Sequence, residues 1–161
     1  NLLRRFRRGY IVVGPDTMSV PGLNNIVEML GAIPLGSTLK QKKEMVNCVK
    51  TRIRQRNFVT IYPEAHMWPY YTGIRPFTDA SFSYPAHTIT PVFAMTTCYQ
   101  KRKIGAFPKT VTYIDGPFYP DESLPVAERK KKLRDQCYNA MKSRAEENST
   151  YEYRIYRKKE E

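Results

Sequence analysis

Apolar residues in the first part of the chain follow two different periods. Tyr10–Val13 is a continuous apolar run that ends at a Gly-Pro pair, which predicts a buried strand. Between positions 23 and 30 the apolar residues instead recur at i, i+3, i+4 and i+7. This spacing predicts a helix packed on one face, with Gly31 as its C-terminal glycine. Ala32–Leu35 follows as a second short apolar segment.

A capping signal introduces the next predicted helix. Thr38 and Gln41 have the spacing of a capping box. In this motif the Thr side chain accepts from the backbone N–H of the Gln, and the Gln side chain accepts from the backbone N–H of the Thr. The helix carries four apolar residues on one side and basic residues elsewhere: Met45, Val46, Val49 and Ile53. Asn57 can adopt the left-handed conformation that ends a helix. Phe58–Tyr62, β-branched and aromatic, then predicts a buried strand that stops at Pro63.

The second half of the chain continues the alternation. Residues 64–88 are aromatic and contain prolines, which predicts irregular structure. Ile89–Tyr99 and Thr110–Ile114 have strand character, and Gly116-Pro117 should break the second strand. A long helix should begin at Leu124-Pro125. Its inward side is predicted to hold five residues: Val126, Leu133, Cys137, Ala140 and Met141.

Strands that alternate with amphipathic helices predict the fold class. We expect an α/β protein, a single layered domain over residues 1–161 with a central mixed sheet flanked by helices. Residues 149–161 alternate in polarity and then become charged, so they predict an edge strand or a charged tail. The chain has no initiator Met, and we expect the domain to be incomplete at its N-terminus.

Composition limits the class of protein. With 41% hydrophobic and 26% charged residues, 161 residues can build one core, and disorder along the whole length is excluded. No apolar run approaches the roughly 18 residues that span a bilayer, and no signal peptide is visible. Three separated cysteines, without metal-ligand spacing, predict buried thiols in a reducing compartment and no metal site. The net charge of +12, gathered in clusters at residues 4–8, 40–56 and 129–132, favours a polyanionic partner: nucleic acid, anionic lipid or a phosphorylated cofactor.

The candidate chemistry follows the strand Phe58–Tyr62. In α/β sheets, sites lie beyond the carboxyl ends of strands, and here that position is occupied by Pro63 and Glu64. Together with His66 and Arg75, Glu64 could orient a phosphorylated or hydroxylated substrate. A structural Glu that caps a loop, with a surface His, is the alternative. The aromatic segment 68–84 predicts loop packing, an apolar slot for an acyl chain, or a contact with a membrane interface.

Five segments, in order and with plausible spacing, resemble the glycerolipid acyltransferases, the lysophospholipid and 1-acylglycerol-3-phosphate acyltransferase family. The similar segments are Pro21–Leu23 with Met29–Pro34, Phe58–Glu64, Arg75–Thr78 with Phe82, Thr90–Val92, and Val111–Pro117. The resemblance implies transfer of an acyl group from acyl-CoA or acyl carrier protein to a lysophospholipid or related glycerolipid. The resemblance implies no cofactor. It also implies that the protein acts at an anionic membrane surface, on the cytoplasmic face, where it is either peripheral or anchored by a preceding segment.

The resemblance also assigns roles to residues. The family's catalytic His and Asp, separated by four residues, are expected upstream of residue 1. Glu64, with Pro63, matches the block that positions the acceptor. Ala65, His66 and Met67 replace Gly, Thr and Arg of that block, Ser37 stands where a basic residue is usual, and Thr78 replaces Lys. Arg75 or Lys40 could supply the missing cation for an acceptor phosphate, or the acceptor could be a different lipid.

Two other functions fit the same sequence. Basic clusters and aromatics permit a nucleic-acid-binding module, although the aromatics gather in one segment and no RNA-binding signature is present. If the chain is an acyltransferase, as the resemblance implies, we expect no nucleic acid among its partners. A degenerate member of the family that binds lipid without turnover would also be compatible with the altered block at 64–67.

Overall fold

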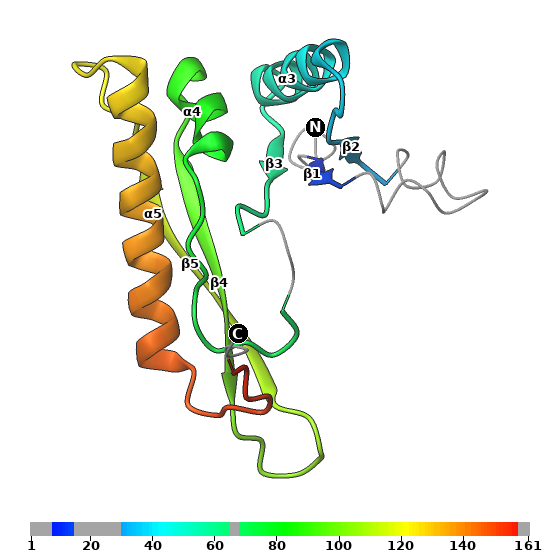
Figure 1. Cartoon of the computed structure of the whole chain (residues 1–161), viewed down its shortest axis with the longest axis vertical. Coiled ribbons are helices and arrows are strands. Elements are labelled where there is room, and N and C mark those ends of the chain that lie inside the picture. The colour runs from blue at the N-terminus through cyan, green and yellow to red at the C-terminus, as the bar shows by residue number, and fades with distance from the viewer. Residues whose placement is uncertain (1–7, 15–29, 65–67, 158–161) are drawn as a thin grey trace, which may run out of the picture. The chain divides into compact units, whose positions relative to one another are not determined.

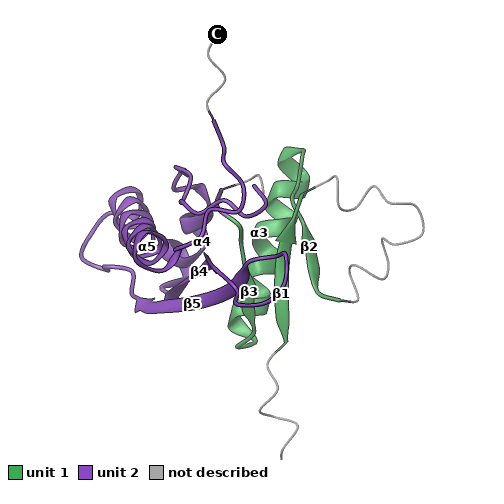
Figure 2. Ribbon diagram, turned by 90° about the horizontal axis from the view of Figure 1, so that it is seen from below, with its two compact units in different colours: residues 1–62 green, residues 63–161 purple. Residues whose placement is uncertain are grey.

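The computed structural model describes residues 8–14, 30–64 and 68–157, and the chain divides into two units after Tyr62. Unit 1 covers residues 1–62 and unit 2 covers residues 63–161 (Figure 2). Each unit has its own sheet, parallel in unit 1 and antiparallel in unit 2, with an α-helix packed against the sheet in both units. The predicted α/β class is therefore confirmed. The single domain over residues 1–161 stays a prediction.

Unit 1 is a small parallel sheet with one described helix. Its strands are β1 (Gly9–Val13), β2 (Ala32–Pro34) and β3 (Phe58–Thr60), in the order β2-β1-β3. Helix α3 (Leu39–Arg54) begins with the predicted capping box. It buries Met45 and Val49, two of its four predicted inward residues. The helix predicted over positions 23–30 lies outside the described residues, apart from the exposed Leu30.

Two details of unit 1 differ from the sequence expectation. The left-handed residue after α3 is Arg56, with φ of 63°, and not Asn57. The Asn57 side chain instead accepts a hydrogen bond from the backbone N–H of Arg8 at 3.2 Å, which ties the end of the helix to the start of β1. Strand β3 is shorter than predicted and lies at the edge of this sheet, where Phe58 is 59% exposed. It is therefore not the buried strand that its composition indicates.

Unit 2 is a long hairpin covered by a long helix (Figure 1). Strands β4 (Val92–Gln100) and β5 (Lys109–Phe118) pair antiparallel, and α5 (Val126–Asn148) packs on one face of the pair. The 3-10 helix η2 (Ala80–Phe82) and α4 (Ser83–Thr88) complete the packing at one end. The core cluster of unit 2 comes from β4, η2, α4 and α5, with Phe77 added from the segment before η2: Phe77, Phe82, Ala86, Ala94, Leu133, Cys137 and Met141.

The predicted elements of unit 2 exist, with altered bounds. Residues 64–88 are not irregular throughout, because η2 and α4 form there. Gly116-Pro117 does not break β5, which continues through a cis peptide bond to Phe118. On α5, Val126 is exposed, and Ala145 is buried in the row of Leu133, Cys137 and Met141.

The C-terminal segment packs against unit 2 without becoming a strand. No strand forms within its described part, 149–157. A single backbone hydrogen bond, from Tyr151 N–H to the carbonyl of Tyr99 at 3.2 Å, joins this part to β4. The Ser149 hydroxyl accepts from the N–H of Tyr99 at 3.3 Å, and tyrosine rings of the segment pack on other rings. The predicted edge strand is thus replaced largely by side-chain contacts.

Arg129 joins three segments of unit 2. Its Nε and Nη2 donate, at 2.8 to 3.0 Å, to three backbone carbonyls before α5: those of Asp121, Glu122 and Leu124. Its Nη1 donates at 2.9 Å to the carbonyl of Ala86 in α4. One guanidinium thus satisfies four backbone acceptors, and it fixes the loop between β5 and α5.

Two more members of the basic run 129–132 have partners in the same unit. Lys130 forms an ion pair with Asp79 at 3.3 Å, and Lys132 pairs with Asp121 at 2.7 Å. Hydrogen bonds from Lys132 and Ser123 lower the pKa of the Asp121 carboxyl to about 2. The clustering of charge at 129–132 therefore reflects internal pairing more than a surface for polyanions.

The three cysteines should differ sharply in reactivity. Cys98 and Cys137 are 0% and 2% exposed, and burial raises the pKa of Cys98 and raises that of Cys137 to about 12. Because the thiolate is the reactive form, we expect iodoacetamide to label Cys48, which is half-buried, in the folded protein. Cys98 and Cys137 should become labelled only after unfolding. Peptide mass spectrometry would measure this, and equal labelling of Cys137 and Cys48 would contradict the packing described here.

Candidate functional site

Glu64 and Arg75 are in contact, and both belong to unit 2. The Arg75 backbone N–H donates to Oε2 of Glu64 at 3.0 Å across a part-buried position. The carboxylate thus fixes the backbone of the segment that carries Arg75, which goes beyond the exposed, ligand-orienting position expected from sequence. Charge-assisted hydrogen bonds of this type are about twice as strong as neutral ones. Glu64 is therefore a loop anchor as well as a candidate ligand-binding group.

The Arg75 guanidinium is oriented by an aromatic ring. It lies 4.4 Å from the centroid of the Trp68 ring, which is a close cation–π contact. Tyr156, from the C-terminal segment, stacks on Trp68 at 4.9 Å, and Tyr71 packs edge-on against it at 5.3 Å. The Tyr156 hydroxyl also donates to the carbonyl of Pro69 at 2.8 Å. Tyr71 and Tyr156, from two distant segments, thus pack on the Trp68 ring that contacts the cation.

The other predicted site residues have different surroundings. Pro63 begins the turn that carries Glu64, and it is half-buried. Thr78 is exposed, and its hydroxyl accepts from the N–H of Ala80 at 3.5 Å, at the start of η2. Lys40 is exposed in the first turn of α3, in unit 1. His66 lies outside the described residues. The structure therefore brings together Glu64 and Arg75 from the predicted set.

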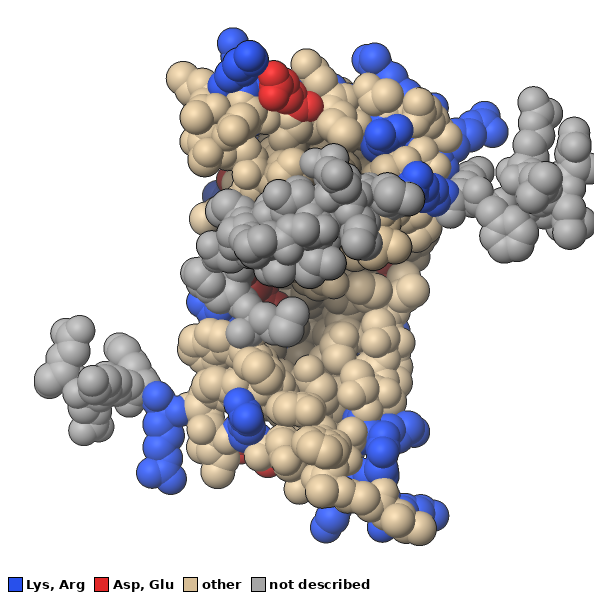
Figure 3. All heavy atoms as spheres, turned by 90° about the vertical axis from the view of Figure 1, so that its right-hand side faces the viewer, with Lys and Arg blue, Asp and Glu red and all other residues tan. Residues whose placement is uncertain are grey.

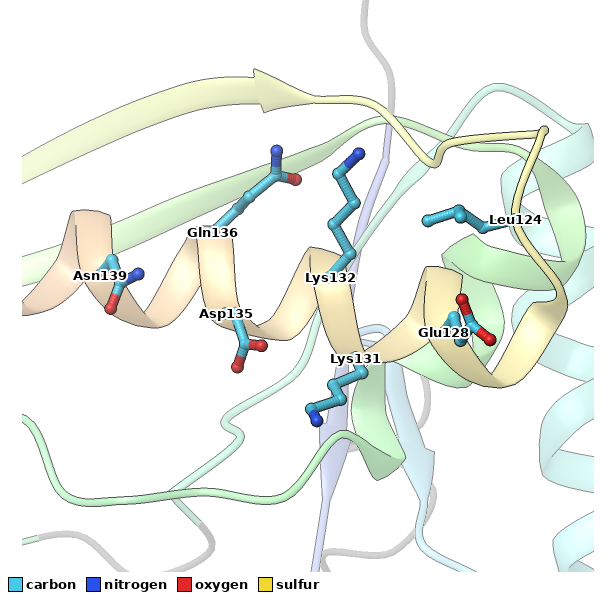
Figure 4. A pocket seen from close by; sticks show the side chains of 7 residues that line it. All are labelled: Leu124, Glu128, Lys131, Lys132, Asp135, Gln136 and Asn139. Atoms are coloured by element: carbon cyan, nitrogen blue, oxygen red, sulfur yellow. The ribbon is translucent and has the colours of Figure 1, made fainter.

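A pocket of about 410 Å³ on α5 does not have the geometry of a binding site (Figure 4). It is lined by Leu124, Glu128, Lys131, Lys132, Asp135, Gln136 and Asn139. Lys132 and Gln136 point to one side of the helix, whereas Lys131 and Asp135 point to the other. Lys132 is already paired with Asp121. Within the described ranges, no group of three His, Cys, Asp or Glu side chains could hold a metal ion.

Comparison with known proteins gives one structural match. No protein-family model and no curated sequence matches this chain. The crystal structure of the 1-acyl-sn-glycerophosphate acyltransferase of Thermotoga maritima superposes with a TM-score of 0.57 at 15% identity. The match covers 84% of this chain and 56% of that protein.

The chain shares its fold with an acyltransferase.

This acyltransferase fold agrees with the fold class expected from the family resemblance. The chain spans little more than half the length of the matched protein. Within the described part of the chain, no helix is both long enough and apolar enough to cross a bilayer.

The sequence does not predict the packing of Tyr156 on Trp68, the ring that contacts Arg75. The sequence predicts that the segment around Trp68 packs as a loop, lines an apolar slot for an acyl chain or contacts a membrane interface, and it identifies no partner for the segment. The sequence signal for this packing is the set of three tyrosines, Tyr151, Tyr153 and Tyr156, whose alternation predicts an edge strand. A tyrosine-rich segment can equally pack its rings on another aromatic group, and here Tyr156 does so.

Proposed function

We propose that this chain is the acceptor-binding part of an O-acyltransferase that acylates a glycerolipid at a membrane surface. The observation that carries the proposal is the acyltransferase fold over 84% of the chain, with the Glu64–Arg75 contact at the block that resembles the family's acceptor-positioning segment. The proposed donor is acyl-CoA or acyl carrier protein. The proposed acceptor is a lysophospholipid or a related glycerolipid.

The reaction requires a base that this chain does not contain at the family's spacing, since neither His66 nor His87 is followed by an Asp five positions later. His87 is engaged locally, with Nδ1 2.6 Å from the carbonyl of Ser83. In the proposal, a His preceding residue 1 removes the proton from the acceptor hydroxyl. The hydroxyl oxygen then attacks the thioester carbonyl, the carbon–sulfur bond breaks, and the thiol leaves with a proton.

Arg75 is the group that we assign to the acceptor. A guanidinium is always charged and can contact two phosphate oxygens at once, and stacking on Trp68 holds its plane in place. Glu64 then acts as the residue that positions Arg75, because it holds the Arg75 backbone N–H. Thr78 is proposed as a lesser contributor to acceptor binding, from its place in the resembling block Arg75–Thr78. The role of Lys40, which lies outside the resembling blocks and in unit 1, stays a prediction.

The test is acyl transfer by the full-length protein. We expect labelled acyl-CoA or acyl carrier protein to yield a labelled diacyl product with at least one of two acceptors, lysophosphatidate or lysophosphatidylcholine. The phosphate is a monoester in lysophosphatidate and a diester in lysophosphatidylcholine. A preference for lysophosphatidate would therefore show that a cation is required at the phosphate-binding position. Failure with both acceptors and both donors, while lipid binding persists, would favour a lipid-binding protein without turnover.

A further inference from the structure

The loop between β4 and β5 exposes apolar side chains. Ile104 is 87% exposed and Phe107 is 60% exposed. Both lie in residues 101–108, the connection at the tip of the hairpin, which extends past the C-terminal end of α5 in Figure 1. Single exposed apolar residues are ordinary, but two large ones at a protruding tip indicate a contact surface.

Basic residues surround these apolar side chains. The segment 101–109 contains no Asp or Glu, and four of its nine residues are basic: Lys101, Arg102, Lys103 and Lys109. Within the described part of the chain, none of the four forms an ion pair, in contrast to Lys130 and Lys132. At the lower end of Figure 3, the hairpin end of unit 2, Lys and Arg side chains lie around an uncharged projection. These four charges are therefore available to an anionic partner.

Half-buried tyrosines form a set next to the loop. Phe107 packs on Tyr153 at 6.0 Å between ring centroids, and Tyr153 packs on Tyr70 at 4.9 Å and on Tyr151 at 6.4 Å. Tyr70 also contacts Tyr99, at the end of β4, at 5.5 Å. Tyrosine is enriched at membrane–water interfaces because its ring is apolar and its hydroxyl is polar. The loop thus presents apolar tips, a tyrosine layer and basic residues together.

We propose that the hairpin tip, residues 101–108, docks on an anionic lipid surface, with Ile104 and Phe107 entering the headgroup region. The combination of exposed apolar side chains with unpaired basic residues fits a bilayer, which offers both an apolar interior and anionic headgroups. Nucleic acid would use the charges and could stack on Phe107, but it offers no apolar phase for Ile104. The inference deepens the membrane part of the proposed function by naming the segment, and it does not require acyl transfer.

The experiment is vesicle co-sedimentation of the full-length protein, with phosphatidylcholine vesicles that contain or lack phosphatidylglycerol. The double variant Ile104→Ser/Phe107→Ser should bind anionic vesicles at least about tenfold more weakly, because two apolar side chains no longer leave water. The triple variant Lys101→Gln/Arg102→Gln/Lys103→Gln should also bind more weakly, with a smaller response to salt. Ile104→Ser alone should give part of the loss, and it removes no ring contact with Tyr153.

A matched control is available at the other end of β5. Tyr119 is 67% exposed, which is similar to the 60% exposure of Phe107. Two acidic residues, Asp121 and Glu122, follow it closely, so its surroundings are not basic. Tyr119→Ser should therefore leave vesicle binding within about twofold of the wild type. Circular dichroism of every variant would show whether it is folded.

Several results would overturn the proposal. One is wild-type vesicle binding by the folded double variant; another is an equal loss in the Tyr119→Ser control. A third is weaker binding of single-stranded RNA by the triple variant while its vesicle binding is unchanged, which would assign the basic loop to nucleic acid. Acyl transfer to a water-soluble short-chain acceptor is measured separately. Its absence would reject the proposed enzymatic function without affecting the vesicle result.

Discussion

Replacing Glu64 with glutamine should lower acyl transfer by the full-length protein by about tenfold or more, with the free energy of unfolding lowered by no more than about 1 kcal/mol, because the bond to the Arg75 N–H becomes a neutral one. Glutamine keeps the size of the side chain and can still accept from the Arg75 N–H, but it removes the charge. A tenfold loss corresponds to about 1.4 kcal/mol of transition-state stabilisation, which is within the strength of one charge-assisted hydrogen bond.

Glu64→Ala should cost more activity than Glu64→Gln, on the order of a hundredfold, because it also removes the acceptor that holds the Arg75 backbone. Glu128→Gln is a suitable control, since Glu128 is an exposed carboxylate on α5 in the same unit. It should leave the rate unchanged. Full activity in Glu64→Gln would show that the charge has no role in the reaction, and loss of the folded state would assign Glu64 a purely structural role.

Replacing Arg129 with methionine should lower the free energy of unfolding by about 3 kcal/mol. The variant keeps an apolar stem but leaves four backbone carbonyls without the guanidinium that they share. Buried acceptors that lose a charged donor cost about 1 to 3 kcal/mol each, and solvent can reach part of this group, so the sum is reduced. Urea denaturation followed by circular dichroism would measure the change.

Lys131 is the matched control for Arg129. It is exposed on the same helix, and it forms no ion pair within the described residues. Lys131→Met should therefore stay within about 0.5 kcal/mol of the wild type. Arg129→Lys should fall between the wild type and Arg129→Met, because one ammonium cannot reach all four carbonyls. Equal stability of Arg129→Met and Lys131→Met would mean that the arginine network contributes nothing to folding.

Local signals in the sequence predicted the elements whose chemistry is local. The capping box at Thr38 and Gln41 fixes the start of α3, and the apolar run Tyr10–Val13 lies within β1, although only Tyr10 of the run is buried and Ile11 is exposed. β-branched composition located β3 but not its burial. Phe58 is exposed in the edge strand β3, and Ile11 is exposed in the central strand β1, since the burial of a strand side chain depends on what packs on the face of the sheet, which no local pattern encodes.

The candidate site was predicted in part for the same reason. Glu64 and Arg75 were selected because one follows a strand and the other lies in a resembling block, and their hydrogen bond spans only 11 positions. The stacking of Tyr156 on Trp68 joins segments that are far apart in the chain, so neither segment alone indicates it. Likewise, the run 129–132 counts as surface charge in the sequence, whereas three of its members bind backbone or carboxylate oxygens nearby.

The hydrogen bond from Tyr156 to Pro69 has a consequence for how the protein is made. Its two residues are 87 positions apart, so the bond closes a large loop, and it can form only after the C-terminal segment has left the ribosome. The core of α5 on the hairpin can pack before that, since it needs no residue beyond the end of α5. Synthesis from the N-terminus therefore yields a packed unit first and an ordered Trp68–Arg75 stack last. Under the proposed function, the acceptor-binding loop would therefore reach its final order only after Tyr156 has been synthesised.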